Sequence, residues 1–290
     1  MMRVALAAAA FLALAQSAWA AEILIHDGKS QPESLTMAPD GVLIAGSAGS
    51  PYVYAVRKGA GSAERFIDAS ADGPDVFFFG QLADAAANTL WTCQLKPAAG
   101  VPTGRKSSLR GFDLKSGKEK LRWDLPGAGS TCNDFVVGPD KALYIADTTN
   151  SKIYRLAPGA GVPELFLEDR VLLGIDGITF LDGVLYVNNV WFNKLYRIPI
   201  DPAGKPGAPV DIWMDAPVKG PDGMRAARGR LFVAENGAGK VDALTIKGDT
   251  AHVVVLKDGL NTPTGVEPVG DTLWFSERGT GKVWSIPMPK

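Results

Sequence analysis

The chain has 290 residues, with 30 lysines and arginines against 31 aspartates and glutamates, which gives a formal net charge of -1. This balance argues against a broad phosphate-binding surface, so we expect no nucleic-acid partner. Hydrophobic residues make up 46% of the chain and charged residues 21%, a composition that excludes a disordered chain.

The first 20 residues have the pattern of a secretory signal peptide. Arg3 gives a positively charged start, the run Val4 to Ala15 is apolar, and Ala18-Trp19-Ala20 has the small-x-small pattern of a cleavage site. An uncleaved membrane anchor is the alternative, but the run is short for a span of ~20 residues. We therefore expect residues 1–20 to be removed and residues 21–290 to form one exported domain, periplasmic or extracellular, without a membrane span.

A unit of four short strands recurs along the remaining chain. Each copy contains an apolar strand that starts at a leucine, and these leucines lie at positions 43, 90, 143, 185, 231 and 273. This period is typical of propeller blades. The sixth copy lacks its fourth strand, and Glu22 to Asp27 resembles the other fourth strands. The pattern predicts an all-β fold, a six-bladed β-propeller with four-stranded blades, closed by the N-terminal strand.

A shared register predicts a ring of six residues at one mouth of the central channel. They stand nine or ten residues before the leucines: Glu33, Gly80, Asn133, Asp176, Asp222 and Thr264. Three carboxylates on a narrow axis repel one another unless protons or a cation lie between them. Oxygen ligands suit Ca²⁺, Mg²⁺ or Mn²⁺, and neither His26 nor His252 shares this register. The alternative is that the Asn-Asp and Asp-Gly pairs are ordinary turns.

The motifs at these positions resemble the regucalcin/gluconolactonase family of six-bladed propellers, whose members hydrolyse lactones. The motifs are Pro32-Glu33-Ser34, Cys132-Asn133-Asp134-Phe135, Gly174-Ile175-Asp176-Gly177-Ile178 and Gly220-Pro221-Asp222-Gly223-Met224. The resemblance implies that Glu33, Asp176 and Asp222 hold a divalent cation and that Asp222 is the catalytic acid/base. Asn133 would bind the metal, its water or the substrate. Calcium is the expected cation, with magnesium, manganese or zinc as alternatives.

Two departures from the family pattern affect specificity. Asp176 stands where many members have asparagine, which adds a negative charge. Thr131 stands where sugar-lactone members often have arginine, which argues against sugar-acid lactones. The histidine dyad of the related paraoxonases has no counterpart, because His26 and His252 fall on predicted outermost strands.

Further substrate-binding candidates lie around the predicted mouth. The loops between second and third strands should open on that face; one, Gln94 to Ser108, carries Arg105, and another carries Asn189 and Trp191. Phe79 lies in the connection into the second blade, and the ring contributes Asn133 and Thr264. Aromatic groups beside a charged cavity suit a partly apolar lactone or ester. The alternatives are ordinary packing for the Phe run and a solvated lid for the basic loop.

The two cysteines, Cys93 and Cys132, should lie near the same mouth on neighbouring blades. An exported chain meets an oxidising compartment, so we expect a disulfide between them. Two free buried thiols are the alternative.

The sequence as a whole predicts an exported, metal-dependent hydrolase of lactones or small esters. No Gly-x-Ser-x-Gly motif is present, which disfavours a serine hydrolase of the α/β-hydrolase type. The main alternative is a non-enzymatic propeller that binds a ligand or protein and keeps a structural metal. Metal-free condensation of the strictosidine-synthase type is a further alternative, which the ring of three carboxylates disfavours.

Overall fold

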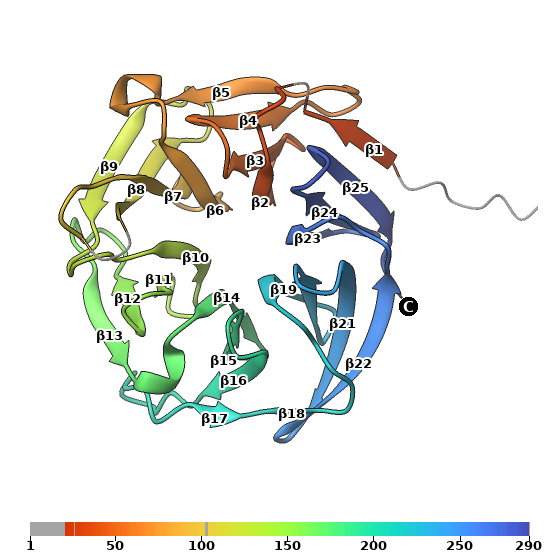
Figure 1. Cartoon of the computed structure of the whole chain (residues 1–290). Helices are drawn as coiled ribbons and strands as arrows, with labels where there is room; N and C mark the ends of the chain where they lie inside the picture. Colours follow the sequence, from red (N-terminus) through yellow and green to blue (C-terminus); the bar gives the residue numbers. More distant parts are fainter. Residues whose placement is uncertain (1–20, 26, 102–103, 290) are drawn as a thin grey trace, which may run out of the picture.

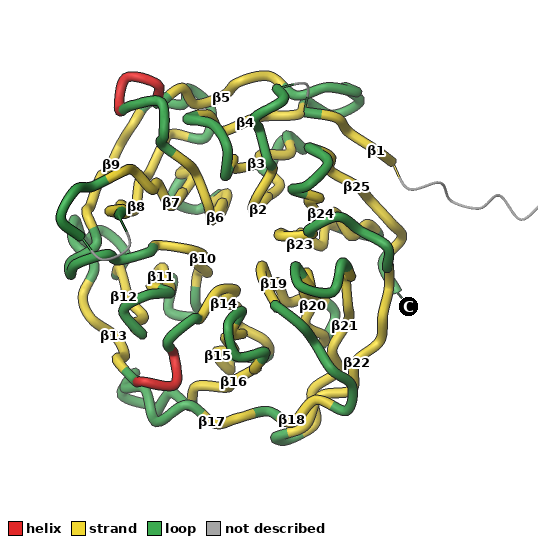
Figure 2. The backbone as a smooth tube through the Cα atoms, in the orientation of Figure 1, coloured by secondary structure: helices red, strands yellow, loops and turns green. Residues whose placement is uncertain are grey.

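The computed structural model describes residues 21–25, 27–101 and 104–289, so the predicted signal peptide and His26 lie outside the described residues. These residues form β-strands and two short 3₁₀ helices, Ser70–Asp72 and Arg170–Leu172, with no α-helix among them. Both short helices lie at the periphery, where Figure 2 draws them in red. The predicted all-β fold is confirmed. Within the described ranges, no helix is long and apolar enough to span a membrane.

The strands follow one another in antiparallel runs (Figure 1). The first run contains β2 (Pro32–Met37), β3 (Leu43–Ser47), β4 (Tyr52–Val56) and β5 (Glu64–Asp68). The second contains β6 (Phe77–Asp84), β7 (Thr89–Pro97), β8 (Arg105–Asp113) and β9 (Glu119–Asp124). The third contains β10 (Cys132–Val137), β11 (Leu143–Asp147), β12 (Lys152–Leu156) and β13 (Glu164–Glu168).

The next runs complete the circle in Figure 1. They contain β14 (Ile175–Leu181), β15 (Val184–Asn189), β16 (Lys194–Ile198) and β17 (Val210–Asp211). Then come β18 (Trp213–Met214), β19 (Pro221–Ala227), β20 (Arg230–Glu235), β21 (Lys240–Lys247) and β22 (Thr250–Lys257). The last are β23 (Pro263–Val269), β24 (Thr272–Glu277) and β25 (Lys282–Pro287), joined by β1 (Ala21–Leu24).

The inner strands β2, β6, β10, β14, β19 and β23 surround a central axis (Figure 1). Each contacts the next, and β23 contacts β2, so they form a closed ring. The N-terminal strand completes the circle on the outside, because β1 pairs antiparallel with β25 from Ala21–Ser285 to Leu24–Lys282. The predicted pairing of the first strand with the last is present.

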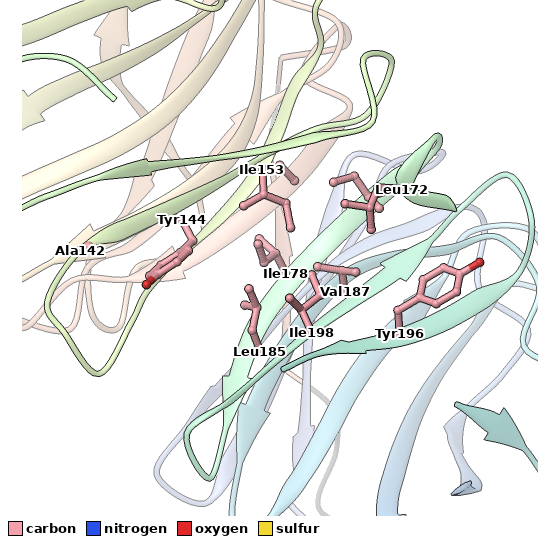
Figure 3. Close-up of a cluster of buried hydrophobic side chains, with 11 residues drawn as sticks. Ala142, Tyr144, Ile153, Leu172, Ile178, Leu185, Val187, Tyr196 and Ile198 are labelled. Carbon is pink, nitrogen blue, oxygen red and sulfur yellow. The ribbon is translucent and has the colours of Figure 1, made fainter. Parts of the chain in front are cut away.

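Apolar side chains fill the spaces between neighbouring sheets. Figure 3 shows one such cluster, in which Tyr144 and Ile153 of one sheet face Ile178, Leu185 and Val187 of the next. Equivalent clusters lie at the other junctions, including one that joins Ile23 of β1 to Leu35 of β2. Burial of these alternating apolar residues holds adjacent sheets together and so fixes the positions of the inner strands.

Every inner strand carries a pairing irregularity at the same place. The register shifts between Pro32 and Leu35, Phe78 and Gln81, Cys132 and Phe135, Ile175 and Ile178, Pro221 and Met224, and Pro263 and Val266. Bulges of this kind re-aim side chains and are frequent beside active sites. They place Glu33, Asn133, Asp176, Asp222 and Thr264 at equivalent positions, as predicted.

In the second run the prediction that Gly80 is the ring residue is wrong by one position. The bulge lies between Phe78 and Gln81, so Phe79 occupies the ring position and Gly80 the next one. The error arose because polar Gln81 stands where the other inner strands have an apolar residue. Gln81 is buried and donates to the Thr92 hydroxyl at 2.6 Å.

Glycine at the position after the ring residue lets neighbouring inner strands approach closely. A Cβ atom on Gly80 would lie 2.4 Å from the Asn133 carbonyl oxygen, and one on Gly223 would lie 2.6 Å from that of Thr264. Such distances are too short for any side chain. These glycines therefore keep the axis narrow and bring the ring residues of successive sheets together.

Two further strand predictions need correction. The repeat places the fourth strand of the fourth copy at Asp211–Met214, but the structure splits this strand. Buried Ile212 separates β17, which pairs with β16, from β18, which pairs with β22. The predicted loop Gln94 to Ser108 belongs largely to a long hairpin, in which β7 and β8 pair as far as Pro97 and Arg105.

Candidate functional site

Four polar residues from four inner strands meet at the ring. Glu33 of β2 is 5% exposed, and Asn133 of β10, Asp176 of β14 and Asp222 of β19 are each 6% exposed. Asn133 bonds to Asp176, and the charges of Glu33, Asp176 and Asp222 act on one another, so these four residues lie near one another. Within the part of the chain that the structure describes, however, no three acidic, histidine or cysteine side chains are spaced to hold a metal ion. Burying several carboxyl groups is costly unless protons, cations or donors compensate their charge.

Asn133 and Asp176 contact each other directly. The Asn133 amide Nδ2 donates to Asp176 Oδ2 at 2.8 Å and to the Thr148 hydroxyl at 3.0 Å. Among the described residues, this is the one hydrogen bond that offsets the burial of the Asp176 carboxyl group. Burial therefore raises the pKa of Asp176 well above its usual value, and the charges of Asp222 and Glu33 raise it further.

Asp222 is the best-anchored carboxylate of the ring. Its Oδ1 accepts the Gly223 amide at 2.9 Å, and its Oδ2 accepts the Asn236 side chain at 3.0 Å. Burial raises the pKa of Asp222 to about 7, while the Asn236 hydrogen bond and the charge of Arg278 act to lower it. A carboxyl group with this pKa can exchange a proton near neutral pH.

The third acid, Glu33, also favours its protonated form. Burial raises the pKa of Glu33 well above its usual value, and the neighbouring charge of Asp222 raises it further. Arg278 and Arg225 act in the opposite direction. The backbone carbonyl of Glu33 is held by the hydroxyls of Thr264 at 2.7 Å and Ser276 at 2.6 Å.

A buried ion network adjoins the ring. Arg225 of β19 binds Asp134 of β10, with Nη1–Oδ2 2.6 Å and Nη2–Oδ1 3.0 Å, and its Nη2 also donates to the Gln81 carbonyl at 3.2 Å. Its Nε lies 3.8 Å from Glu267, too far for a hydrogen bond. Ring and network together contain five carboxyl groups and two guanidinium groups: Glu33, Asp134, Asp176, Asp222, Glu267, Arg225 and Arg278.

Sequence reasoning missed three ring neighbours, although a signal for them existed. Thr148, Asn236 and Arg278 each stand five residues after a repeat leucine, in the loops between second and third strands. Thr148 and Asn236 bond to ring residues, and Arg278 acts on Glu33 and Asp222 through space. These loops therefore lie on the face of the ring, as predicted. Arg225 was missed because its partners come from distant strands.

The predicted disulfide is present. Cys93 of β7 and Cys132 of β10 are bonded, with their Cα atoms 5.3 Å apart, and both are fully buried. The bond links two sheets immediately before Asn133, so it restrains a ring residue.

The remaining substrate-binding candidates have different surroundings. Thr264 is buried in the ring, where its hydroxyl bonds to the carbonyls of Pro32 and Glu33. Phe79 is half-buried at its ring position and packs against the cluster that contains Cys93. The guanidinium carbon of Arg105 lies 4.7 Å from the centre of the Phe77 ring. His252, which the sequence pattern placed outside the predicted site, lies on β22 beside Asp215.

Asn189 supports a loop rather than facing a ligand. Its Oδ1 accepts the amides of Trp191 and Phe192 at 3.1 and 2.9 Å, and its Nδ2 donates to the carbonyls of Leu173 and Val171 at 2.7 and 3.3 Å. Trp191 and Phe192 are more than half exposed. Asn189 therefore presents two aromatic side chains to solvent on the loop between β15 and β16.

Comparisons with known proteins show the fold. No family model and no curated protein matches the sequence. A gluconolactonase from Xanthomonas campestris superposes with a TM-score of 0.69 at 18% identity, over 93% of this chain and 90% of that one. The virginiamycin B lyase of Staphylococcus aureus superposes with a TM-score of 0.65 at 17% identity, over 93% of this chain and 99% of the lyase. The chain is a β-propeller.

A third solved propeller, assigned as a gluconolactonase, superposes with a TM-score of 0.70 at 19% identity, over 93% of this chain and 92% of that one. These neighbours include both gluconolactonases and a lyase, so the propeller alone does not determine the reaction.

Proposed function

We propose that this chain is an exported, single-domain propeller of six four-stranded blades that opens lactones or small esters at a divalent cation. The observation that carries the proposal is the meeting of three buried carboxyl groups, Glu33, Asp176 and Asp222, with the Asn133 amide on the propeller axis. The likeness to gluconolactonase structures supports a lactone-type substrate.

The donor atoms of the ring, though not their spacing in this structure, suit a hard cation. With every group ionised, the five carboxylates exceed the two guanidinium groups by three negative charges, which a divalent cation would reduce to one. Carboxylate and amide oxygens are the ligands that Ca²⁺ prefers, with Mg²⁺ and Mn²⁺ as alternatives and Zn²⁺ less suited. Among the described residues, however, no three acidic, histidine or cysteine side chains are spaced to hold a metal ion.

Glu33, Asp176, Asp222 and Asn133 would hold the cation. When bound, it would polarise the substrate carbonyl and stabilise the negative charge that develops on its oxygen. Asp222 would remove a proton from the attacking water as the water oxygen bonds to the carbonyl carbon. Asp222 would then pass this proton to the leaving oxygen of the lactone when the bond between that oxygen and the carbonyl carbon breaks. Gly223 and Asn236 orient the Asp222 carboxylate for these transfers.

Other residues around the ring would bind the organic part of the substrate. Phe79 offers an apolar surface at the ring position of its strand, and Trp191 supplies an exposed aromatic surface on a loop of the same face. Such groups suit a lactone or ester with an apolar portion. We place Asn133 beside the carbonyl, Thr264 at its own ring position as a secondary contact, and Arg105 further out.

Export is supported by two separate features. Residues 1–20 have the composition of a signal peptide, and Cys93 and Cys132 form a disulfide, which persists in oxidising compartments. We therefore assign the mature chain to the periplasm or the extracellular space.

The test of the proposal is the neutral variant Asp222→Asn. Loss of the general base should reduce turnover of a lactone by roughly 10²–10⁴-fold, while the thermal unfolding midpoint stays near that of the wild type. Asp201→Asn, in an exposed turn, is the matched control and should remain active. Unchanged turnover in Asp222→Asn would refute the assignment, and a metal-binding wild type that leaves a lactone and ester panel intact would be a binding propeller.

A further inference from the structure

A large cavity lies beside the ring on its loop face. Its volume is about 780 Å³, and its lining includes Asp27, Gln31, Asn236, Thr262 and Arg278. Asn236 belongs to both features, because its side chain donates to Asp222 Oδ2 at 3.0 Å. A group bound in this cavity would therefore lie next to the carboxylate that we assign as the catalytic base.

Arg278 is the unsatisfied charge of this cavity. Its backbone amide donates to Thr262 at 2.9 Å, which fixes the loop. Within the described ranges, no acceptor lies within hydrogen-bond or ion-pair distance of its guanidinium group, which acts on Glu33 and Asp222 only through space. An arginine side chain has five N–H donors in a planar fork that matches a carboxylate.

Two acids close to Arg278 in the cavity lining or in the sequence, Asp27 and Glu277, are already bound elsewhere. Asp27 accepts the Tyr54 hydroxyl at 2.7 Å and Arg65 at 3.2 Å. Glu277 accepts the Asn261 amide at 2.7 Å and the Trp284 indole at 2.8 Å. These carboxylates therefore have donors of their own, and the donors of Arg278 remain available to a ligand.

We infer that this cavity is a carboxylate subsite and that the preferred substrate is a lactone carrying a free carboxylate, which Arg278 binds. The inference rests on the proposed function. A monoanion matches one guanidinium group, whereas a dianionic phosphate would bring two negative charges next to Asp27, Glu33 and Asp222 with one guanidinium group in the cavity lining to balance them. Arg278 is thus a specificity-determining residue.

The first test compares γ-carboxy-γ-butyrolactone with its carboxamide, which has the same shape without the charge. We expect the wild type to favour the carboxylate in kcat/KM by about tenfold or more, the value of a charge-assisted hydrogen bond. Arg278→Gln should abolish this preference by raising KM for the carboxylate lactone. Arg278→Lys should keep part of the preference. Because Arg278 also acts on Asp222, only the ratio between the two substrates is diagnostic.

Arg57→Gln is the matched control, since Arg57 is exposed and paired with Glu64 on the surface. It should keep the wild-type ratio. Equal rates for the two lactones in the wild type, or an unchanged ratio in Arg278→Gln, would overturn the inference.

A second test separates the subsite from the reaction. Cyclopentanecarboxylate and cyclopentanecarboxamide cannot be hydrolysed as lactones, and their binding is measured by titration of the full-length mature protein. Preference for the carboxylate that disappears in Arg278→Gln supports the subsite even if no lactone is turned over, in which case only the proposed reaction fails. Equal binding of the two compounds would overturn the subsite whatever the activity.

Discussion

Arg225 and Asp134 form a two-pronged buried ion pair between inner strands that are not neighbours in the ring. Their contacts measure 2.6 Å for Nη1–Oδ2 and 3.0 Å for Nη2–Oδ1, across 91 residues of sequence. The pair connects β19 to β10, and the bond from Arg225 to Gln81 adds β6. It thereby braces the strands that carry Asp222 and Asn133. The two charges of the pair have opposite effects on Glu33, because Asp134 raises the pKa of Glu33 and Arg225 lowers it.

Breaking this pair should destabilise the protein strongly. Removing one partner leaves a buried charge without compensation, which costs ~3–5 kcal/mol. We expect Arg225→Met and Asp134→Asn each to lose stability of this order in chemical denaturation. The double variant should lose much less than the sum of the two, because it leaves neither charge buried alone. Additive losses would show that the two side chains are not coupled.

A buried acid outside the ring and its ion network, Asp242 of β21, should make stability depend on pH. Among the described residues, no hydrogen-bond donor reaches either of its carboxylate oxygens. Burial, together with the neighbouring carboxyl of Glu235, raises the pKa of Asp242 to about 8, and Lys240 opposes this only weakly. Asp242 therefore holds a proton in the folded protein at a pH where the unfolded chain has lost it.

The direction in which stability changes with pH follows from the proton that Asp242 binds in the folded state. The stabilising proton is bound in full below the unfolded pKa of 3.8, and its benefit is lost as pH rises towards about 8. We expect Asp242→Asn to gain stability relative to the wild type by up to ~1.4 kcal/mol for each pH unit across this interval, followed by a plateau. Denaturation at a series of pH values measures this difference.

Asp249→Asn provides a control of opposite sign. The hydrogen bond from Arg197 lowers the pKa of Asp249, so its ionised form stabilises the fold and the variant should lose stability as pH rises above the acid range. A constant difference between Asp242→Asn and the wild type at all pH values would contradict the assignment of a buried proton.

The strand pattern of the chain could be predicted well from local sequence. The repeat leucines and the alternation around them mark the strands, because burial between sheets depends on local periodicity. The prediction failed where a polar residue replaced an apolar one, as at Gln81, and where one strand served two sheets, around Ile212. Such exceptions depend on neighbours from other parts of the chain.

The acids of the ring were also predictable, because equivalent positions in a repeat occupy equivalent places around an axis. Their partners were harder to predict. Asp134 adjoins a predicted ligand, yet its contact with Arg225 arises only when the ring closes. Arg278 shares its position in the repeat with Asn236 and Thr148, so the register did contain a signal for it.

The disulfide should contribute measurably to stability. Cys93 and Cys132 are separated by 39 residues, and closing a loop of this length removes about 2–4 kcal/mol of unfolded-chain entropy. We expect the double variant Cys93→Ala/Cys132→Ala to lose stability of this order. Adding a reductant should lower the unfolding midpoint of the wild type and leave that of the variant unchanged. A variant as stable as the wild type would contradict this role.

Asn189 should act on substrate binding through the loop that it supports. Asn189→Ala removes the acceptor for the Trp191 and Phe192 amides, so the aromatic loop should lose its fixed conformation. We expect KM for an ester with an apolar chain to rise several-fold, with a smaller change in kcat. Trp191→Ala should reproduce the rise in KM. An unchanged KM in both variants would exclude this loop from substrate binding.

The proposed reaction requires a divalent cation in the ring. The most direct test is elemental analysis of the purified mature protein before and after chelation, with lactone turnover measured on both samples and after calcium is restored. We expect one cation per chain, loss of turnover on chelation and recovery with the metal. A folded protein without bound metal, or with turnover that chelation leaves unchanged, would contradict it.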